Sequence, residues 1–161
     1  MDPYLLFYFH FIHPVRKKIE ISRGDPIFSH YVPERKYSAW KGLAFEFLCF
    51  QSGQLIAEKL GFGAVNYEFG SWFSRNRNQD GGQIDLLFIR ADRVITLCEI
   101  KFQDGKVGKD IMAEVEKKRN VLPNPKGYTI ETVLISASPV TDDLAREKYF
   151  NRILLLENLF D

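Results

Sequence analysis

The sequence predicts a mixed α/β domain with the element order helix, three strands, helix, strand. Two observations support this prediction. Apolar residues recur at helical spacing in two segments, and short apolar runs bounded by turn residues lie between and after them. The chain has 161 residues, of which 45% are hydrophobic, so it is long enough for one domain with an ordinary core.

The first helix is expected from about Ser38 to about Leu60. Ser38 suits the N-cap position, because its hydroxyl can accept a hydrogen bond from a free backbone N–H of the first turn. Gly61 ends the helix, and Ser52-Gly53 is a point at which it can break. One face of this helix carries an apolar stripe, which comprises Trp40, Leu43, Ala44, Phe47 and Leu48. Because the other faces are also apolar, the helix is expected to be deeply buried.

Three strands are expected at residues 64–73, 83–90 and 93–102. Only Ala91-Asp92 separates the last two, which predicts a hairpin. A second helix is expected over residues 108–121, where Ile111, Val115 and Lys118 fall at helical spacing. A strand at residues 129–138 completes this order, and residues 152–156 can form one further strand.

The domain proper is expected at residues 37–161, after an N-terminal aromatic segment and linker at residues 1–36. Residues 2–12 place apolar side chains on every face, which indicates a partner surface: an ATPase domain or a second copy of the chain. This segment is too short to cross a bilayer and lacks the features of a signal peptide. We therefore expect a cytoplasmic protein without a membrane anchor.

Overall composition gives little information about the partner. The net charge of +1 neither indicates nor excludes nucleic acid, so a DNA-binding face would need local clustering of basic residues. Cys49 and Cys98 lie in separate apolar runs without the spacing of a zinc site. They are expected to be buried free thiols.

The chemically informative residues lie on the second and third predicted strands. Strand side chains alternate, so Glu99 and Lys101 point to the same face. Asp85 lies on the preceding strand of the hairpin. Charges within apolar strands are costly unless they pair or bind a metal ion. Two carboxylates can hold Mg²⁺ or Mn²⁺, and the neighbouring lysine can orient a metal-activated water for phosphodiester hydrolysis.

The pattern Asp85…Glu99-x-Lys101, preceded by a helix, resembles the PD-(D/E)xK (restriction-endonuclease-like) nuclease superfamily over roughly residues 37–138. The resemblance implies a core with a mixed central sheet flanked by helices. It also implies that Asp85 and Glu99 are metal ligands and that Lys101 is catalytic. Glu46 matches the accessory Glu of the family's first helix, since it is the only charged residue between Lys41 and Glu58. Ile84 replaces the proline of the family motif.

A closer resemblance involves the C-terminal nuclease-like domain of bacterial and archaeal AAA-type ATPases. The strings that carry it are DPYLLFYFHFI, WKGLAFE, GGQIDLLFIR and LCEIKF. It implies that residues 2–12 are the end of a preceding winged-helix region. The chain has no GxxxxGK[ST] motif, so it carries no ATPase of its own. It is expected to be a detached part or a stand-alone relative.

Basic residues near the motif are candidates for contacts with DNA phosphates: Arg75, Arg77, Lys106 and Lys109. Simpler interpretations remain open for several of these features. Glu99 and Lys101 can form an ordinary ion pair, and Glu46 can pair with Lys41. Residues 74–80 can be a solvated loop. The basic residues 117–119 can follow the phosphate backbone, but the intervening Glu114 and Glu116 favour an ordinary solvated helix face. A non-catalytic module that regulates an ATPase is the alternative function.

Overall fold

The computed structural model describes residues 2–22, 32–74 and 82–160. Its centre is a mixed five-stranded sheet in the order β1-β2-β3-β4-β5. The pairs β1–β2 and β2–β3 are antiparallel, while β3–β4 and β4–β5 are parallel. The strands are β1 (Tyr67–Phe73), β2 (Gln83–Arg90), β3 (Val94–Lys101), β4 (Thr129–Ser136) and β5 (Arg152–Leu155).

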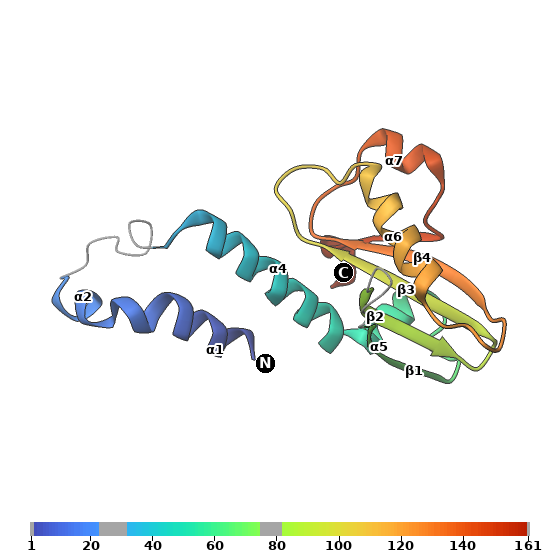
Figure 1. The fold of residues 1–161 in the computed structure, drawn as a ribbon, viewed down its shortest axis with the longest axis horizontal. Coiled ribbons are helices and arrows are strands. Elements are labelled where there is room, and N and C mark those ends of the chain that lie inside the picture. The colour runs from blue at the N-terminus through green and yellow to red at the C-terminus, as the bar shows by residue number, and fades with distance from the viewer. Residues whose placement is uncertain (1, 23–31, 75–81, 161) are drawn as a thin grey trace.

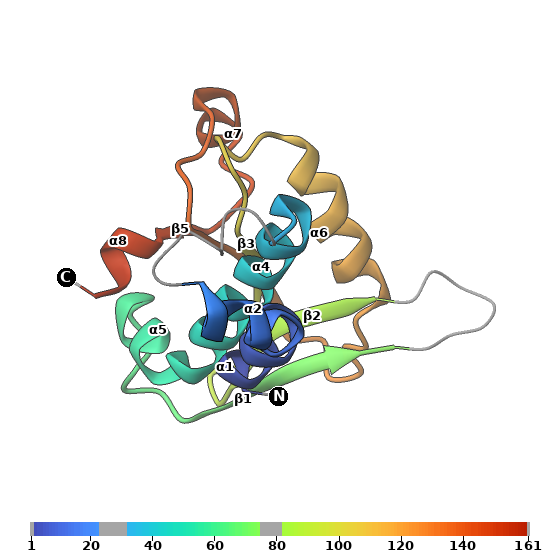
Figure 2. The ribbon, with the colours of Figure 1, turned by 90° about the vertical axis from the view of Figure 1, so that its left-hand side faces the viewer.

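Helices cover both faces of this sheet. One core cluster joins the sheet to α4 (Glu34–Gln51), α5 (Gly53–Lys59) and α8 (Leu156–Leu159). The other joins it to α6 (Asp110–Val121) and α7 (Asp142–Glu147). Figure 2 shows α5 and α8 at the left of the molecule, α6 at the right and α7 at the top. The predicted α/β class, with a mixed sheet flanked by helices, is therefore confirmed.

The first predicted helix differs at its start and is broken near its end. It begins at Glu34 rather than Ser38, and Pro33 occupies the N-cap without a side-chain hydrogen bond. Proline suits a helix start because its missing N–H would be unsatisfied there in any case. The break falls at Ser52, as the Ser52-Gly53 pair suggested, and separates α4 from α5. Gly61 has φ +86°, which fits a glycine ending the second helix.

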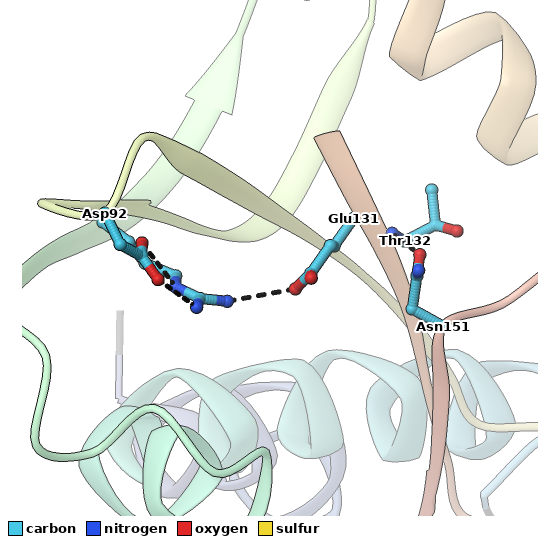
Figure 3. Close-up of polar contacts among 5 residues, drawn as sticks. Asp92, Glu131, Thr132 and Asn151 are labelled. Carbon is cyan, nitrogen blue, oxygen red and sulfur yellow. Dashed lines mark hydrogen bonds and ion pairs between the residues drawn. The ribbon is translucent and has the colours of Figure 1, made fainter. Parts of the chain in front are cut away.

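The hairpin between β2 and β3 is one residue longer than predicted. Its turn spans residues 91–93, and Arg93 takes a left-handed conformation with φ 66°. A three-residue loop with its last residue in this region is a common hairpin connection. Arg90, at the end of β2, pairs with Asp92 of the turn and with Glu131 of β4, the latter at 3.0 Å. Figure 3 shows these pairs beside the hydrogen bond between Thr132 and Asn151.

The N-terminal segment is helical. It contains α1 (Pro3–Phe7), a π-helical segment (Tyr8–Ile12) and α2 (Arg16–Ile21), and α1 lies beside α4 (Figure 1). The indole Nε1 of Trp40 donates to the carbonyl of Pro3 at 3.0 Å. Tyr4 and Phe9 remain 70% and 59% exposed. Within the described residues, no helix is long and apolar enough to cross a membrane.

Candidate functional site

The predicted site lies where the sheet divides. Pairing between β2 and β3 ends at Leu86↔Cys98. Beyond this point β2 continues along β1, and β3 continues along β4 as far as Lys101. Asp85 and Glu99 are the first residues past the last pair. The two strands therefore part where the two predicted metal ligands lie.

A register shift in β2 gives Asp85 its direction. Gly70 pairs with Leu87 but Trp72 pairs with Ile84, so β2 contains one extra residue there. As a result Ile84 packs in the cluster on the α6 side, and Leu86 packs in the cluster on the α4 side. Asp85 lines a cavity of about 330 Å³ together with Glu46 of α4. The bulge thus turns Asp85 toward the helix that carries Glu46.

Glu99 is almost completely buried and is held by two lysines. Its side chain is 2% exposed. The ammonium of Lys118, on α6, contacts Oε2 at 2.6 Å, and that of Lys101 lies 3.4 Å from Oε1. The expected pair of Glu99 and Lys101 on one strand face is confirmed. A buried carboxylate requires such partners, because an unpaired buried charge is strongly destabilising.

Lys101 bridges two carboxylates. In addition to Glu99, its ammonium donates to Oε2 of Glu114, on α6, at 2.7 Å. Burial alone lowers the pKa of Lys101, but the hydrogen bond to Glu114 and the charge of Glu99 outweigh burial and raise it. Lys101 is therefore cationic at neutral pH, which suits a residue that stabilises negative charge on a phosphate.

Glu46 belongs to the same electrostatic cluster. Burial raises the pKa of its carboxyl, and the charges of Asp85 and Glu99 raise it further, while Lys118 and Lys101 oppose the shift. The alternative partner Lys41 lies instead over the rings of Tyr37 and Phe102. The structure thus brings Glu46 near the three residues of the strand motif.

The donor set fits Mg²⁺ or Mn²⁺ in chemistry and in charge. Carboxylate oxygens are the ligands that these hard cations prefer. Four carboxylates (Glu46, Asp85, Glu99 and Glu114) and two ammonium groups (Lys101 and Lys118) leave a formal charge of −2, which one divalent cation balances. As the side chains lie, no three His, Cys, Asp or Glu residues within the described ranges form a metal-binding group. Both oxygens of Glu99 face lysines instead.

Lys118 and Glu114 belong to the site but are not among the residues predicted from the sequence. The basic run at residues 117–119 suggested a solvated helix face, and for Lys118 this is wrong, since its side chain is only 20% exposed and pairs with Glu99. The helical spacing in the sequence already indicates that Lys118 lies on the buried face of its helix. Lys118 follows Ile111 and Val115, both buried, on the apolar face of α6.

The predicted phosphate-binding residues are placed only in part. Arg75 and Arg77 lie outside the described residues. Lys106 is exposed in the loop after β3. Lys109, at the N-cap of α6, pairs with Glu147 of α7 rather than with a site carboxylate.

A second cavity, of about 420 Å³, is lined by Lys117, Lys118, Asn120 and Gln83. Gln83 also lines the Asp85 cavity, so the two cavities adjoin at the site.

Both cysteines are free and buried, as expected. Burial raises the pKa of Cys49 to about 12 and raises that of Cys98 as well. Both thiols therefore remain protonated, and neither is a candidate nucleophile or metal ligand.

Comparison with known protein families shows what the chain is similar to. The family DUF234, described as "Archaea bacterial proteins of unknown function", matches residues 8–120, a span that contains Glu46, Asp85, Glu99, Lys101 and Lys118. No curated protein and no solved structure matches the chain. Since the matched span exceeds half of the chain, the protein belongs to the DUF234 family of archaeal and bacterial proteins.

Proposed function

We propose that this chain is a metal-dependent nuclease domain with a restriction-endonuclease-like core, which hydrolyses phosphodiester bonds of nucleic acid, with DNA as the expected substrate. The proposal is carried by the side chains that converge where β2 and β3 part, after the pair Leu86↔Cys98; we call this place the fork of β2 and β3. There the carboxylates of Asp85, Glu99 and Glu46 lie near the ammonium of Lys101. An ordinary surface ion pair does not require a buried glutamate, a strand bulge and a third carboxylate from another element.

Asp85, Glu99 and Glu46 would hold Mg²⁺ or Mn²⁺, which supplies an activated water and neutralises charge on the phosphate oxygens. Lys101 projects from the same strand face as Glu99, and its ammonium lies beside that carboxylate. There it orients the attacking water and stabilises the negative charge that develops on the phosphate. Glu114 keeps the ammonium in place through its 2.7 Å contact.

The full chain is tested on single-stranded DNA, duplex DNA and RNA, each with Mg²⁺, Mn²⁺ or EDTA. We expect cutting with either cation and none with EDTA, with products resolved on a denaturing gel. Failure to cut any of these substrates, together with no binding of either cation by calorimetry, overturns the proposal.

The pKa of Glu46 gives a prediction of its own. Its folded-state pKa is raised, so its contribution to stability is present at acid pH and is lost as the pH rises through that pKa. A Glu46→Gln variant is therefore expected to melt a few degrees higher than wild type at pH 8 without cation. At pH 4 this difference should shrink. Because the carboxylate is an accessory metal ligand, the variant should also bind Mn²⁺ about tenfold more weakly.

Thermal unfolding at both pH values and Mn²⁺ calorimetry at pH 8 check this pair of effects. Glu34→Gln is the control for loss of an exposed carboxylate from the same helix, and it should not melt higher than wild type, because the charge of Glu34 in the first turn favours the helix. A Glu46→Gln variant that is less stable than wild type at pH 8 contradicts the burial argument.

A second candidate function is a non-catalytic module that binds an AAA-type ATPase. The exposed apolar side chains of the N-terminal helices favour it, notably Tyr4, Leu5 and Phe9. The same surface also suits a second copy of the chain. A wild-type protein that binds Mn²⁺ but cuts none of the three substrates would favour this candidate over the nuclease.

A further inference from the structure

Lys118 occupies an unusual position for a helix lysine, because it continues the buried face of α6 and ends at the most buried carboxylate of the site. We propose that Lys118 is an exchangeable counter-ion of Glu99. In the cation-free protein it pairs with Glu99, and when it gives up this carboxylate to a divalent cation, its ammonium binds a nucleic-acid phosphate. This inference rests on the proposed nuclease function and extends it to the order in which the site is assembled.

The two lysines at Glu99 are not equivalent. Lys118 makes the shorter contact, 2.6 Å against 3.4 Å for Lys101. Lys101 is also held by Glu114, whereas Glu99 is the only ion-pair partner of Lys118 among the described residues. A carboxylate oxygen that accepts a short, charge-assisted hydrogen bond has a lone pair less available for a metal. Lys118 is therefore the group with which a cation competes for Glu99.

The released ammonium has a suitable place to go. Lys118 lines the 420 Å³ cavity with Lys117, Asn120 and Gln83, whose side chains all offer N–H donors. Glu114 also lines this cavity, but its carboxylate is paired with Lys101. Lysine and amide donors beside a hydrolytic site are the groups that bind phosphate oxygens in protein–nucleic-acid contacts. Exchange thus moves one positive charge from a protein carboxylate to the substrate.

A single substitution should change two affinities in opposite directions. In Lys118→Met the Glu99 carboxylate loses its nearest competitor, so calorimetry at pH 8 should show Mn²⁺ binding about tenfold tighter than in wild type. With Ca²⁺ in place of Mn²⁺ to prevent cutting, the same variant should bind a single-stranded DNA oligonucleotide about tenfold more weakly, because one phosphate contact is lost.

Lys117→Met is the matched control, since Lys117 lines the same cavity but is exposed and makes no ion pair with Glu99 among the described residues. It should weaken DNA binding and leave Mn²⁺ affinity unchanged. Lys118→Arg keeps the charge at Glu99 and should bind Mn²⁺ as wild type does. If Lys118→Met does not fold, Lys118→Gln takes its place, because the amide keeps a donor to Glu99 but removes the charge. This variant should also bind Mn²⁺ more tightly and DNA more weakly than wild type.

Unchanged or weaker Mn²⁺ binding in a folded neutral variant overturns the role of Lys118. If the wild type still cuts DNA in that case, the proposed nuclease function stands without it. If neither wild type nor variant binds Mn²⁺ and wild type cuts nothing, both proposals fail. Tighter Mn²⁺ binding with unchanged DNA binding overturns the second half, the transfer of Lys118 to phosphate.

Discussion

An Asp85→Asn variant is expected to cut DNA at least about 1000-fold more slowly than the wild type. The amide has nearly the shape of the carboxylate but lacks its charge, so the bulged position stays filled while the metal loses an anionic ligand. Metal ions contribute several kcal/mol to hydrolysis through charge stabilisation, and about 4 kcal/mol corresponds to a factor of 1000. Mn²⁺ affinity should fall in parallel, because Asp85 is a ligand in this scheme.

Single-turnover cleavage and Mn²⁺ calorimetry measure the two effects of Asp85→Asn. The substitution should leave the fold intact, since it removes one unbalanced negative charge from the cluster and keeps an acceptor for Gln83, which donates to Asp85 at 2.8 Å. Asp104→Asn, the same change in the exposed loop after β3, should have no effect on either measurement. Wild-type cutting by Asp85→Asn would exclude Asp85 from the site.

The strand motif was predictable because its cause is local. Alternation along β3 alone places Glu99 and Lys101 on one face, and the short hairpin brings Asp85 to the neighbouring strand. The extra residue in β2 was not predictable, because a bulge follows from how β1 and β2 pair rather than from the residues of either strand. Without it, Asp85 would not face Glu46.

The errors in the helices have physical causes of the same kind. The start of α4 was misplaced because Ser38 has the chemistry of an N-cap, but the chain already meets a helix-starting proline at Pro33. The N-terminal segment, apolar on every face, gave no helical periodicity from which to predict α1. The basic neighbours of Lys118 indicate a solvated helix face, but its ammonium is paired with a buried carboxylate. Its role depends on Glu99, 19 residues away, and only the fold brings the two together.

Lys101→Met is expected to separate catalysis from cation binding. In the proposed mechanism Lys101 orients water and stabilises phosphate charge but holds no metal, so the cleavage rate should fall about 1000-fold. Mn²⁺ affinity should be retained or increase, because Glu99 loses one of its two ammonium neighbours. The fold should tolerate the change, since methionine keeps the apolar stem, Lys118 still pairs with Glu99, and the exposed Glu114 is left in solvent.

Lys126→Met, in the exposed turn before β4, is the control for loss of one positive charge outside the site and should cut within a few-fold of wild type. A Lys101→Met variant that loses Mn²⁺ binding along with activity would show that the lysine maintains the ligand geometry rather than acting on substrate. A variant that cuts at the wild-type rate would remove Lys101 from the mechanism. Asp85→Asn should lose both cleavage and Mn²⁺ binding, whereas Lys101→Met should lose cleavage alone. This difference would assign a metal-ligand role to Asp85 and a catalytic role to Lys101, two residues that lie together at the fork of β2 and β3.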